Sequence, residues 1–161
     1  MPLFNISEAI PDQFIQLLDS KSANASGGIA SFQSWSNRDI NTISNDDTNS
    51  VILSANTFVL PAGSYIVDAA SNFYIVNAVK MRLKNLTDGN ILLSGITAYF
   101  NKNSTAYGNA GITGKFVIGE NKSLALEYYV DSPTSSVYNL GAPVGDGSAE
   151  IYTSIDLRKV G

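Results

Sequence analysis

Apolar and polar side chains alternate with a period of two along most of this chain. Between residues 79 and 84, Val79, Met81 and Leu83 lie on one side of the run and basic residues on the other. Four later runs repeat the pattern, with the apolar sets Leu92, Ile96, Ala98 and Phe100; Ile112, Phe116 and Ile118; Leu124, Leu126, Tyr128 and Val130; and Ile151, Ile155 and Leu157. Because successive side chains of a strand point to opposite faces, the pattern predicts β-strands with one buried face.

Turn-forming sequences separate these runs. "PAG" at 61–63 precedes one strand, "TDGN" at 87–90 links two strands in a hairpin, and "GEN" at 119–121 links another two. No helical pattern of about 15 residues is present. Many short alternating strands joined by turns predict an all-β protein, an antiparallel sandwich or barrel.

The N-terminal part leaves two structures open. Residues 11–20 fit a short helix that begins at Pro11 and buries Phe14, Leu17 and Leu18, and they also fit a strand from Phe14 to Leu18. Residues 1–12 are expected to form an N-terminal arm, followed by one domain over 13–161. The first residues lack a basic end followed by an apolar segment, so no signal peptide is expected.

Two residue types that carry much of enzyme chemistry are missing. The chain has no cysteine and no histidine, which excludes a Ser-His-Asp triad, a cysteine nucleophile and thiolate or imidazole metal sites. A carboxylate pair remains open, but nothing singles out two of the 14 acidic residues. We therefore expect a protein that is not an enzyme, with no cofactor and no metal.

Charge and hydropathy exclude two kinds of partner. The net charge of -4 argues against nucleic acid, which usually binds a basic surface. No apolar run approaches the roughly 18 residues of a membrane span, so no membrane insertion is expected.

Two charged patterns each have a functional and a simpler structural interpretation. The row Lys80, Arg82 and Lys84 fits an anion-binding stripe, but a solvated strand face is favoured, with Asp68 and Glu127 available to neutralise it. The acidic segments 45–49 and 145–147 contain oxygen ligands that suit calcium, but turns are favoured because Asp, Asn and Gly form turns readily.

Three aromatic residues stand in turn-rich segments. Trp35, Tyr107 and Tyr138 are candidates for stacking on a sugar or for packing against a neighbouring subunit, and subunit packing is favoured. They are the candidate ligand or subunit contacts of this chain.

Three segments together resemble one family. They are "LLDSKSANASGGIASFQSWSNRDINT" (17–42), "SANTFVLPAGSYIVDAASNFYIVNAVKMRLKNLTDGNILLSG" (54–95) and "AEIYTSIDLRKVG" (149–161). Within them are an "SGG" turn, an "RDINT" strand at 38–42, an "LPAGSY" strand start, an "RLKNLTDG" hairpin and an alternating last strand. This set is similar to the tumour-necrosis-factor-like, complement-globular-head-like jelly roll of bacteriophage virion proteins.

The resemblance implies an antiparallel jelly-roll sandwich that assembles as a homotrimer and has a structural or adhesive role. It favours the strand over the helix near residue 14, because the family begins with an apolar strand leading into "D-x-K", here Asp19 to Lys21. It implies a non-enzymatic knob on the surface of a phage virion, as a head-decoration or tail accessory protein. The arm would then bind other virion proteins. The alternative is the receptor- or carbohydrate-binding tip of a tail fibre, with a host surface glycan as partner.

Overall fold

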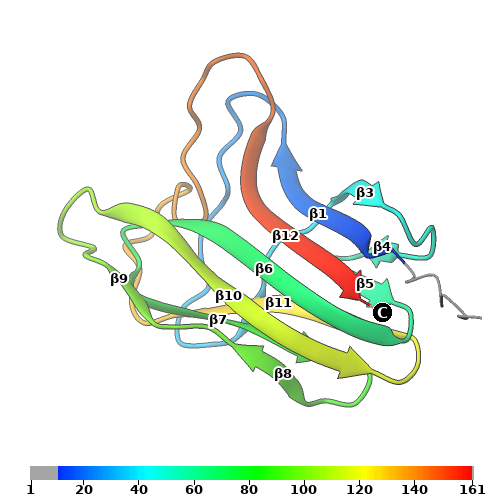
Figure 1. Ribbon diagram of the computed structural model, residues 1–161. Helices are drawn as coiled ribbons and strands as arrows, with labels where there is room; N and C mark the ends of the chain where they lie inside the picture. Colours follow the sequence, from blue (N-terminus) through cyan, green and yellow to red (C-terminus); the bar gives the residue numbers. More distant parts are fainter. Residues whose placement is uncertain (1–10, 161) are drawn as a thin grey trace, which may run out of the picture.

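Two antiparallel β-sheets packed face to face make up residues 11–160, the part of the chain that the computed structural model describes (Figure 1). Sheet A has the order β10-β6-β12-β1-β3. Its strands are β1 (Gln13–Lys21), β3 (Thr42–Asp46), β6 (Gly63–Tyr74), β10 (Tyr107–Ile118) and β12 (Glu150–Val160). The predicted arm at 1–12 lies almost entirely outside the described residues.

Sheet B has the order β4-β5-β11-β7-β8, with β2 paired to β11 and β9 paired to β7. Its strands are β2 (Ser36–Asn37), β4 (Ile52–Ser54), β5 (Thr57–Leu60), β7 (Asn77–Asn85), β8 (Ile91–Ser94), β9 (Ala98–Phe100) and β11 (Lys122–Val130). All strand pairs in both sheets are antiparallel. This confirms the all-β, antiparallel sandwich prediction. Within residues 11–160, no helix has the length and apolar character that a membrane span requires.

The core lies between the sheets and follows the predicted alternation. Strand β7 buries Val79, Met81 and Leu83, β10 buries Ile112, Phe116 and Ile118, and β11 buries Leu124, Leu126, Tyr128 and Val130. Full burial of one large apolar side chain stabilises the fold by about 1.5–3 kcal/mol. On β11 the other face is buried as well, at Ala125 and Glu127; there Arg82 pairs with Glu127, and the Trp35 ring packs against Arg82 and Tyr129.

Residues near position 14 form a strand, as the resemblance implied. Strand β1 buries Ile15 and Leu17, whereas Phe14 lies 39% exposed on the opposite face. A helix would have buried Phe14, Leu17 and Leu18 together. The β1 strand pairs with β12 on one side and β3 on the other.

Three predictions about strand faces and strand bounds were wrong. Ile151 is 48% exposed because a bulge in the β1–β12 pairing shifts the register at Asp19 and Ser20, which turns Ile151 to the outer face. Ile96 is 83% exposed because the chain leaves the sheet between β8 and β9. Residues 38–41 form no strand; β3 begins only at Thr42.

Two long connections meet at one end of the sandwich. The β1–β2 and β11–β12 connections project beyond the ends of β1 and β12 (Figure 1). Backbone hydrogen bonds join them, from Gly27 N to Gly141 O, from Gly28 N to Val137 O and from Leu140 N to Gly28 O. The "GEN" turn is not a hairpin within one sheet, since it carries the chain from β10 in sheet A to β11 in sheet B.

Candidate interaction surfaces

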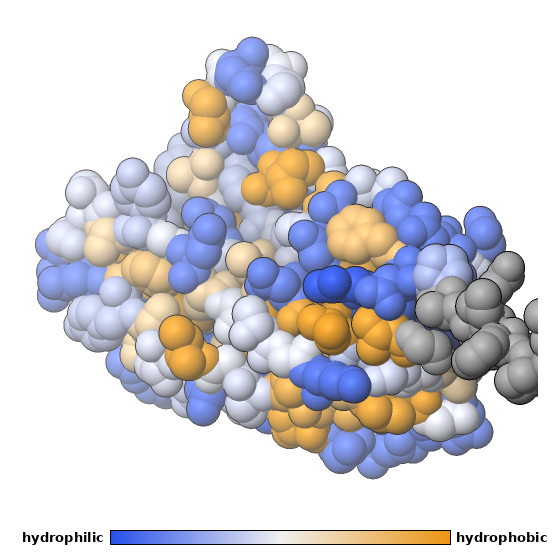
Figure 2. Space-filling model, viewed as in Figure 1, coloured by the Kyte–Doolittle hydropathy of each residue, from blue (hydrophilic) through white to orange (hydrophobic). Residues whose placement is uncertain are grey.

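The outer face of sheet A, which points away from the core, carries apolar side chains that the subunit leaves exposed. They are Phe14 at 39%, Ile66 at 39%, Val117 at 67% and Ile151 at 48% exposure. Figure 2 views this face and shows hydrophobic surface in several patches over β6, β10 and β12, between hydrophilic residues. Apolar patches of this kind are typical of surfaces that contact another molecule.

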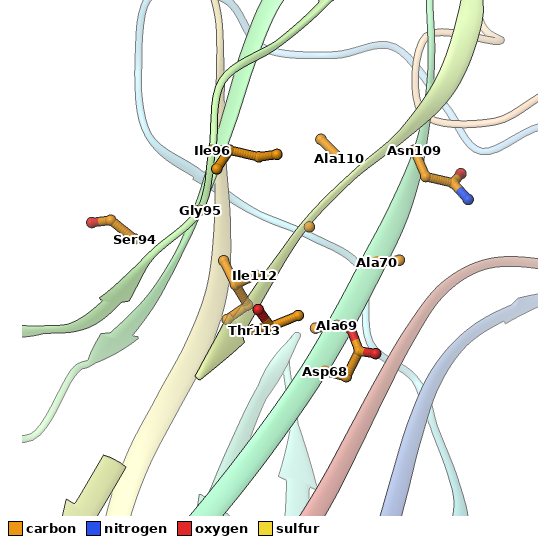
Figure 3. Close-up of a pocket in the computed structure, with 11 residues that line it drawn as sticks. Asp68, Ala69, Ala70, Ser94, Gly95, Ile96, Asn109, Ala110, Ile112 and Thr113 are labelled. Carbon is orange, nitrogen blue, oxygen red and sulfur yellow. The ribbon is translucent and has the colours of Figure 1, made fainter. Parts of the chain in front are cut away.

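The middle of this face is hollowed by small side chains. Across the strands, Gly111 of β10 pairs with Ala70 of β6, and Ala70 pairs with Ser154 of β12. A hollow of about 340 Å³ lies beside this row, between β6, β10 and the segment from Ser94 to Ile96. Figure 3 shows Ile96 at one side of the hollow, with Asn109 and Asp68 toward its opposite side.

Two glycines bring the chain segments around this hollow close together. A Cβ atom on Gly111 would lie 2.2 Å from the carbonyl oxygen of Ala69, and one on Gly95 would lie 2.2 Å from the carbonyl oxygen of Gly111. Both contacts are with backbone atoms, which cannot rotate away. Glycine at position 111 therefore allows β10 to pack closely against β6, and glycine at position 95 allows the β8–β9 connection to pack closely against β10.

Charged residues form two neighbouring rows on the same face. In the first row, Asp68 of β6 stands directly opposite Asp156 of β12. In the second, one alternation along the strands, Lys115 of β10 and Arg158 of β12 flank Ile66. An acidic row thus lies beside a basic row.

Tyr107 and Tyr138, two of the predicted contact residues, lie together. They line a hollow of about 490 Å³ where β6 ends and β10 begins, beside the β11–β12 connection. Tyr107 is 74% exposed and Tyr138 42% exposed. The other lining residues are Asn72, Tyr74, Thr105, Ala142 and Val144. We call this hollow the tyrosine cleft.

Asn72 and Thr105 give the tyrosine cleft polar groups beside its aromatic rings. Neither residue was a candidate from the sequence. Tyr74 and Tyr107 are direct partners in the β6–β10 pairing. The alternating pattern of these two strands is a weak sequence signal for this contact. Tyr138 lies in a loop 31 positions after Tyr107, and nothing in the sequence indicates that the two residues are neighbours.

Trp35, the third predicted contact, lies elsewhere, against the outer side of sheet B. The Arg82 guanidinium carbon lies 3.9 Å from the centre of the indole ring, and the Tyr129 ring lies 5.6 Å from it in a tilted arrangement. The cation and the indole attract each other. Because Arg82 covers part of its ring, Trp35 offers less free aromatic surface than Tyr107 does.

The basic row of β7 is largely neutralised within the chain. Arg82 forms an ion pair with Glu127, and Lys84 Nζ lies 4.0 Å from the same carboxylate. The expectation that Asp68 also neutralises this row was wrong, because Asp68 lies on sheet A. The favoured interpretation, a polar strand face, agrees with these contacts.

The acidic segments form turns held by their own carboxylates. Asp46 accepts hydrogen bonds from the Thr48 hydroxyl and from the backbone N–H groups of Thr48, Ser50 and Val51. Partial burial alone would raise the pKa of Asp46, but these bonds outweigh it and lower the pKa below its ordinary value. Asp146 likewise accepts two bonds from Ser148. Across residues 11–160, no three acidic side chains converge as a metal site would require.

A buried ionic group that the sequence did not reveal lies under the end loops. Arg38 is fully buried and donates to Thr153 Oγ1 at 3.0 Å and to the carbonyl oxygens of Leu140 and Tyr152 at 3.1 and 3.3 Å. Its Nη2 lies 3.8 Å from the buried Asp19 carboxylate. Burial lowers the pKa of Arg38 to about 10 and raises that of Asp19. This cluster ties β1, β12 and the β11–β12 connection together.

Comparison with known proteins identifies the fold and no more. No family model matches the chain, and no curated protein matches its sequence. Among solved structures, murine APRIL at pH 8.0 has a TM-score of 0.59 and 12% identity over 93% of this chain and 100% of that one. The globular domain of zebrafish complement 1qA has a TM-score of 0.59 and 10% identity over 94% and 98%. This chain therefore has the jelly-roll fold that its sequence resemblance implied.

Proposed function

We propose that this protein is a non-enzymatic virion protein, a homotrimeric jelly-roll knob displayed on the surface of a bacteriophage as a head-decoration or tail accessory protein. One observation supports the proposed trimer. On the outer face of sheet A, four apolar side chains are exposed to solvent: Phe14, Ile66, Val117 and Ile151. Covering such a face with further copies removes apolar surface from water, which is the main driving force for association.

The phage setting is supported by the sequence resemblance across residues 17–42, 54–95 and 149–161. The structure adds a rigid two-sheet scaffold on which loops and surface side chains act as contacts, a common arrangement when function lies in binding. In this proposal residues 1–12 attach the knob to other virion proteins.

The particle itself provides the test. In gradient-purified phage that encodes this chain, mass spectrometry should detect it as a stoichiometric component. A variant lacking residues 1–12 should still form the same oligomer in solution but should be missing from the particles. Absence of the full-length chain from purified particles would contradict the proposal.

The tyrosine cleft favours a second candidate function, receptor or carbohydrate binding at the tip of a tail fibre. Two exposed tyrosine rings with an asparagine and a threonine beside them offer stacking surfaces and hydrogen-bonding groups, the combination that holds a sugar ring. No charged side chain lines the cleft, which suits an uncharged sugar.

Tyrosine variants separate this function from subunit packing. If the cleft binds a glycan, Tyr107→Ala and Tyr138→Ala should each weaken binding to a saccharide array by about tenfold or less, without changing the solution mass. Tyr99→Ala is the matched control, since Tyr99 is 64% exposed on sheet B. A change of mass without a change of glycan binding would assign the tyrosines to the subunit contact.

A further inference from the structure

We infer that Lys115 of one copy pairs with the carboxylates of Asp68 and Asp156 of the next copy, so that this ionic contact sets how the subunits fit together. The inference rests on the proposed assembly through the outer face of sheet A. It adds the residues that fix the register of that contact, and its partner is a second copy of this chain.

The carboxylate pair is the first observation. Asp68 and Asp156 are direct cross-strand partners on the outer face, where like charges destabilise a sheet. Asp156 accepts hydrogen bonds from Gln16 Nε2 at 3.0 Å and Ser154 Oγ at 2.9 Å. Asp68 is exposed, and within residues 11–160 its carboxylate has no hydrogen-bond or ionic partner. The chain alone therefore gives Asp68 no direct ionic partner, and the cations Lys115 and Arg158 stand one alternation away from it.

The unpaired cation is the second observation. Lys115 is exposed on β10, and no carboxylate among the described residues lies within 4.0 Å of its ammonium group. Arg158, by contrast, has Asp12 at 3.9 Å. Lys115 and Asp68 thus face the same side of sheet A as free charges of opposite sign.

The position of Lys115 at the edge of the sheet is the third observation. A closed ring of three copies needs contacts between two different patches of the same chain. One patch is the middle of sheet A, where β6 and β12 carry the carboxylates. An edge strand can supply the other, and of the two edge strands only β10 has a cation; β3, with the sequence TISND, has none.

Apolar and small residues on the two patches fit the same arrangement. Val117, at 67% exposure, lies one alternation from Lys115 on the edge strand. The middle of the sheet offers Ala70 and Ser154, whose small side chains leave room for the β10 edge of a neighbour. Laying that edge across the neighbouring face therefore buries Val117 while it brings Lys115 to the carboxylates.

Charge reversal with rescue tests the pairing in the full chain. Asp68→Lys and Lys115→Glu should each raise the dissociation constant of the trimer at least about thirty-fold, measured by light scattering over a dilution series. The double variant D68K/K115E should restore most of the association, because the opposite charges are exchanged. Asp131→Lys, directly after β11, and Lys80→Glu, on β7, lie away from sheet A and are matched controls that should leave the trimer intact.

Two measurements on the unmodified chain complete the test. Raising NaCl from about 0.05 to 1 M should weaken the trimer, since salt screens exposed ion pairs. Adding EDTA should leave the mass unchanged; a loss of the trimer would mean that a divalent cation, and not Lys115, neutralises the carboxylates.

The outcomes separate this inference from the proposed assembly. A trimer that is insensitive to the single reversals, or a double variant that does not recover, overturns the Lys115 pairing and leaves the trimer standing. A wild-type chain that stays monomeric overturns the proposed assembly itself. Far-ultraviolet circular dichroism on each variant confirms that the sandwich is folded; if a reversal unfolds it, Asp68→Asn and Lys115→Gln repeat the test without reversed charges.

Discussion

At the residue scale, the buried Arg38 is the side chain whose removal should cost most. Replacing it with Met removes one of the two cations beside the buried Asp19, leaving Lys21 Nζ at 3.2 Å, and removes a donor to the carbonyl oxygens of Leu140 and Tyr152. We expect Arg38→Met to lower the free energy of unfolding by about 3–5 kcal/mol in urea titrations. Lys80→Met, at a surface position, should change it by about 0.5 kcal/mol or less. Equal effects of the two substitutions would show that the buried cluster contributes nothing to stability.

Asp46 gives a prediction for pH dependence. Its lowered pKa means that the folded chain favours the charged carboxylate, so its contribution is complete above the ordinary value of 3.8 and disappears as the pH falls through the folded-state pKa. Asp46→Asn should therefore lower stability by about 1–3 kcal/mol at pH 7, with the difference from wild type shrinking below pH 3.8. Urea titrations at several pH values measure this, and a difference that is constant with pH would contradict it.

At the element scale, the packing of β10 against β6 depends on Gly111. Gly111→Ala places a methyl group against the Ala69 carbonyl and should lower the free energy of unfolding by about 1–3 kcal/mol. Gly119→Ala is the control, because nothing lies within 4 Å of its added Cβ and the substitution should be neutral or slightly stabilising. Thermal unfolding of both variants is sufficient. A Gly111 variant as stable as the control would mean that the two segments separate easily.

The sequence correctly predicted which side chains of a strand are buried where strand pairing is regular. It failed where the pairing is interrupted. The alternation around Val79 and Ile112 corresponds to the buried face in the structure. It failed at Ile151, because a bulge reverses the face without any change in the local pattern. It failed at Ile96, because that residue lies between two short strands. Bulges and strand ends depend on the partner strand, which a local pattern does not contain.

The candidate sites also depend on contacts between distant segments, which a local sequence pattern does not contain. The sequence named Tyr107, Tyr138 and Trp35, and the fold brings only the two tyrosines into one cleft. Cross-strand neighbours such as Asp68 and Asp156 become visible only once the register of β6 on β12 is known. Arg38 belongs to a stretch that resembles a strand, and its burial follows from loops that fold over it.

At the scale of the whole molecule, the two sheets have different surroundings. Sheet B has a basic row that is largely paired to Glu127, and its exposed apolar side chains, Ile52, Ile91 and Tyr99, lie on the short strands β4, β8 and β9. Sheet A exposes apolar side chains on its long strands β6, β10 and β12, beside a hollow lined by small residues. This asymmetry is what a subunit with one contact face and one outward face would show. The proposed trimer therefore requires that the outer face of sheet A is buried in the assembled protein.

Light scattering on the purified chain at low micromolar concentration tests this claim most directly. If copies of the chain cover sheet A as a trimer, we expect a mass about three times the 17.1 kDa of the single chain. A monomer that persists as the concentration is raised would contradict it, and the exposed face of sheet A would then need a different partner.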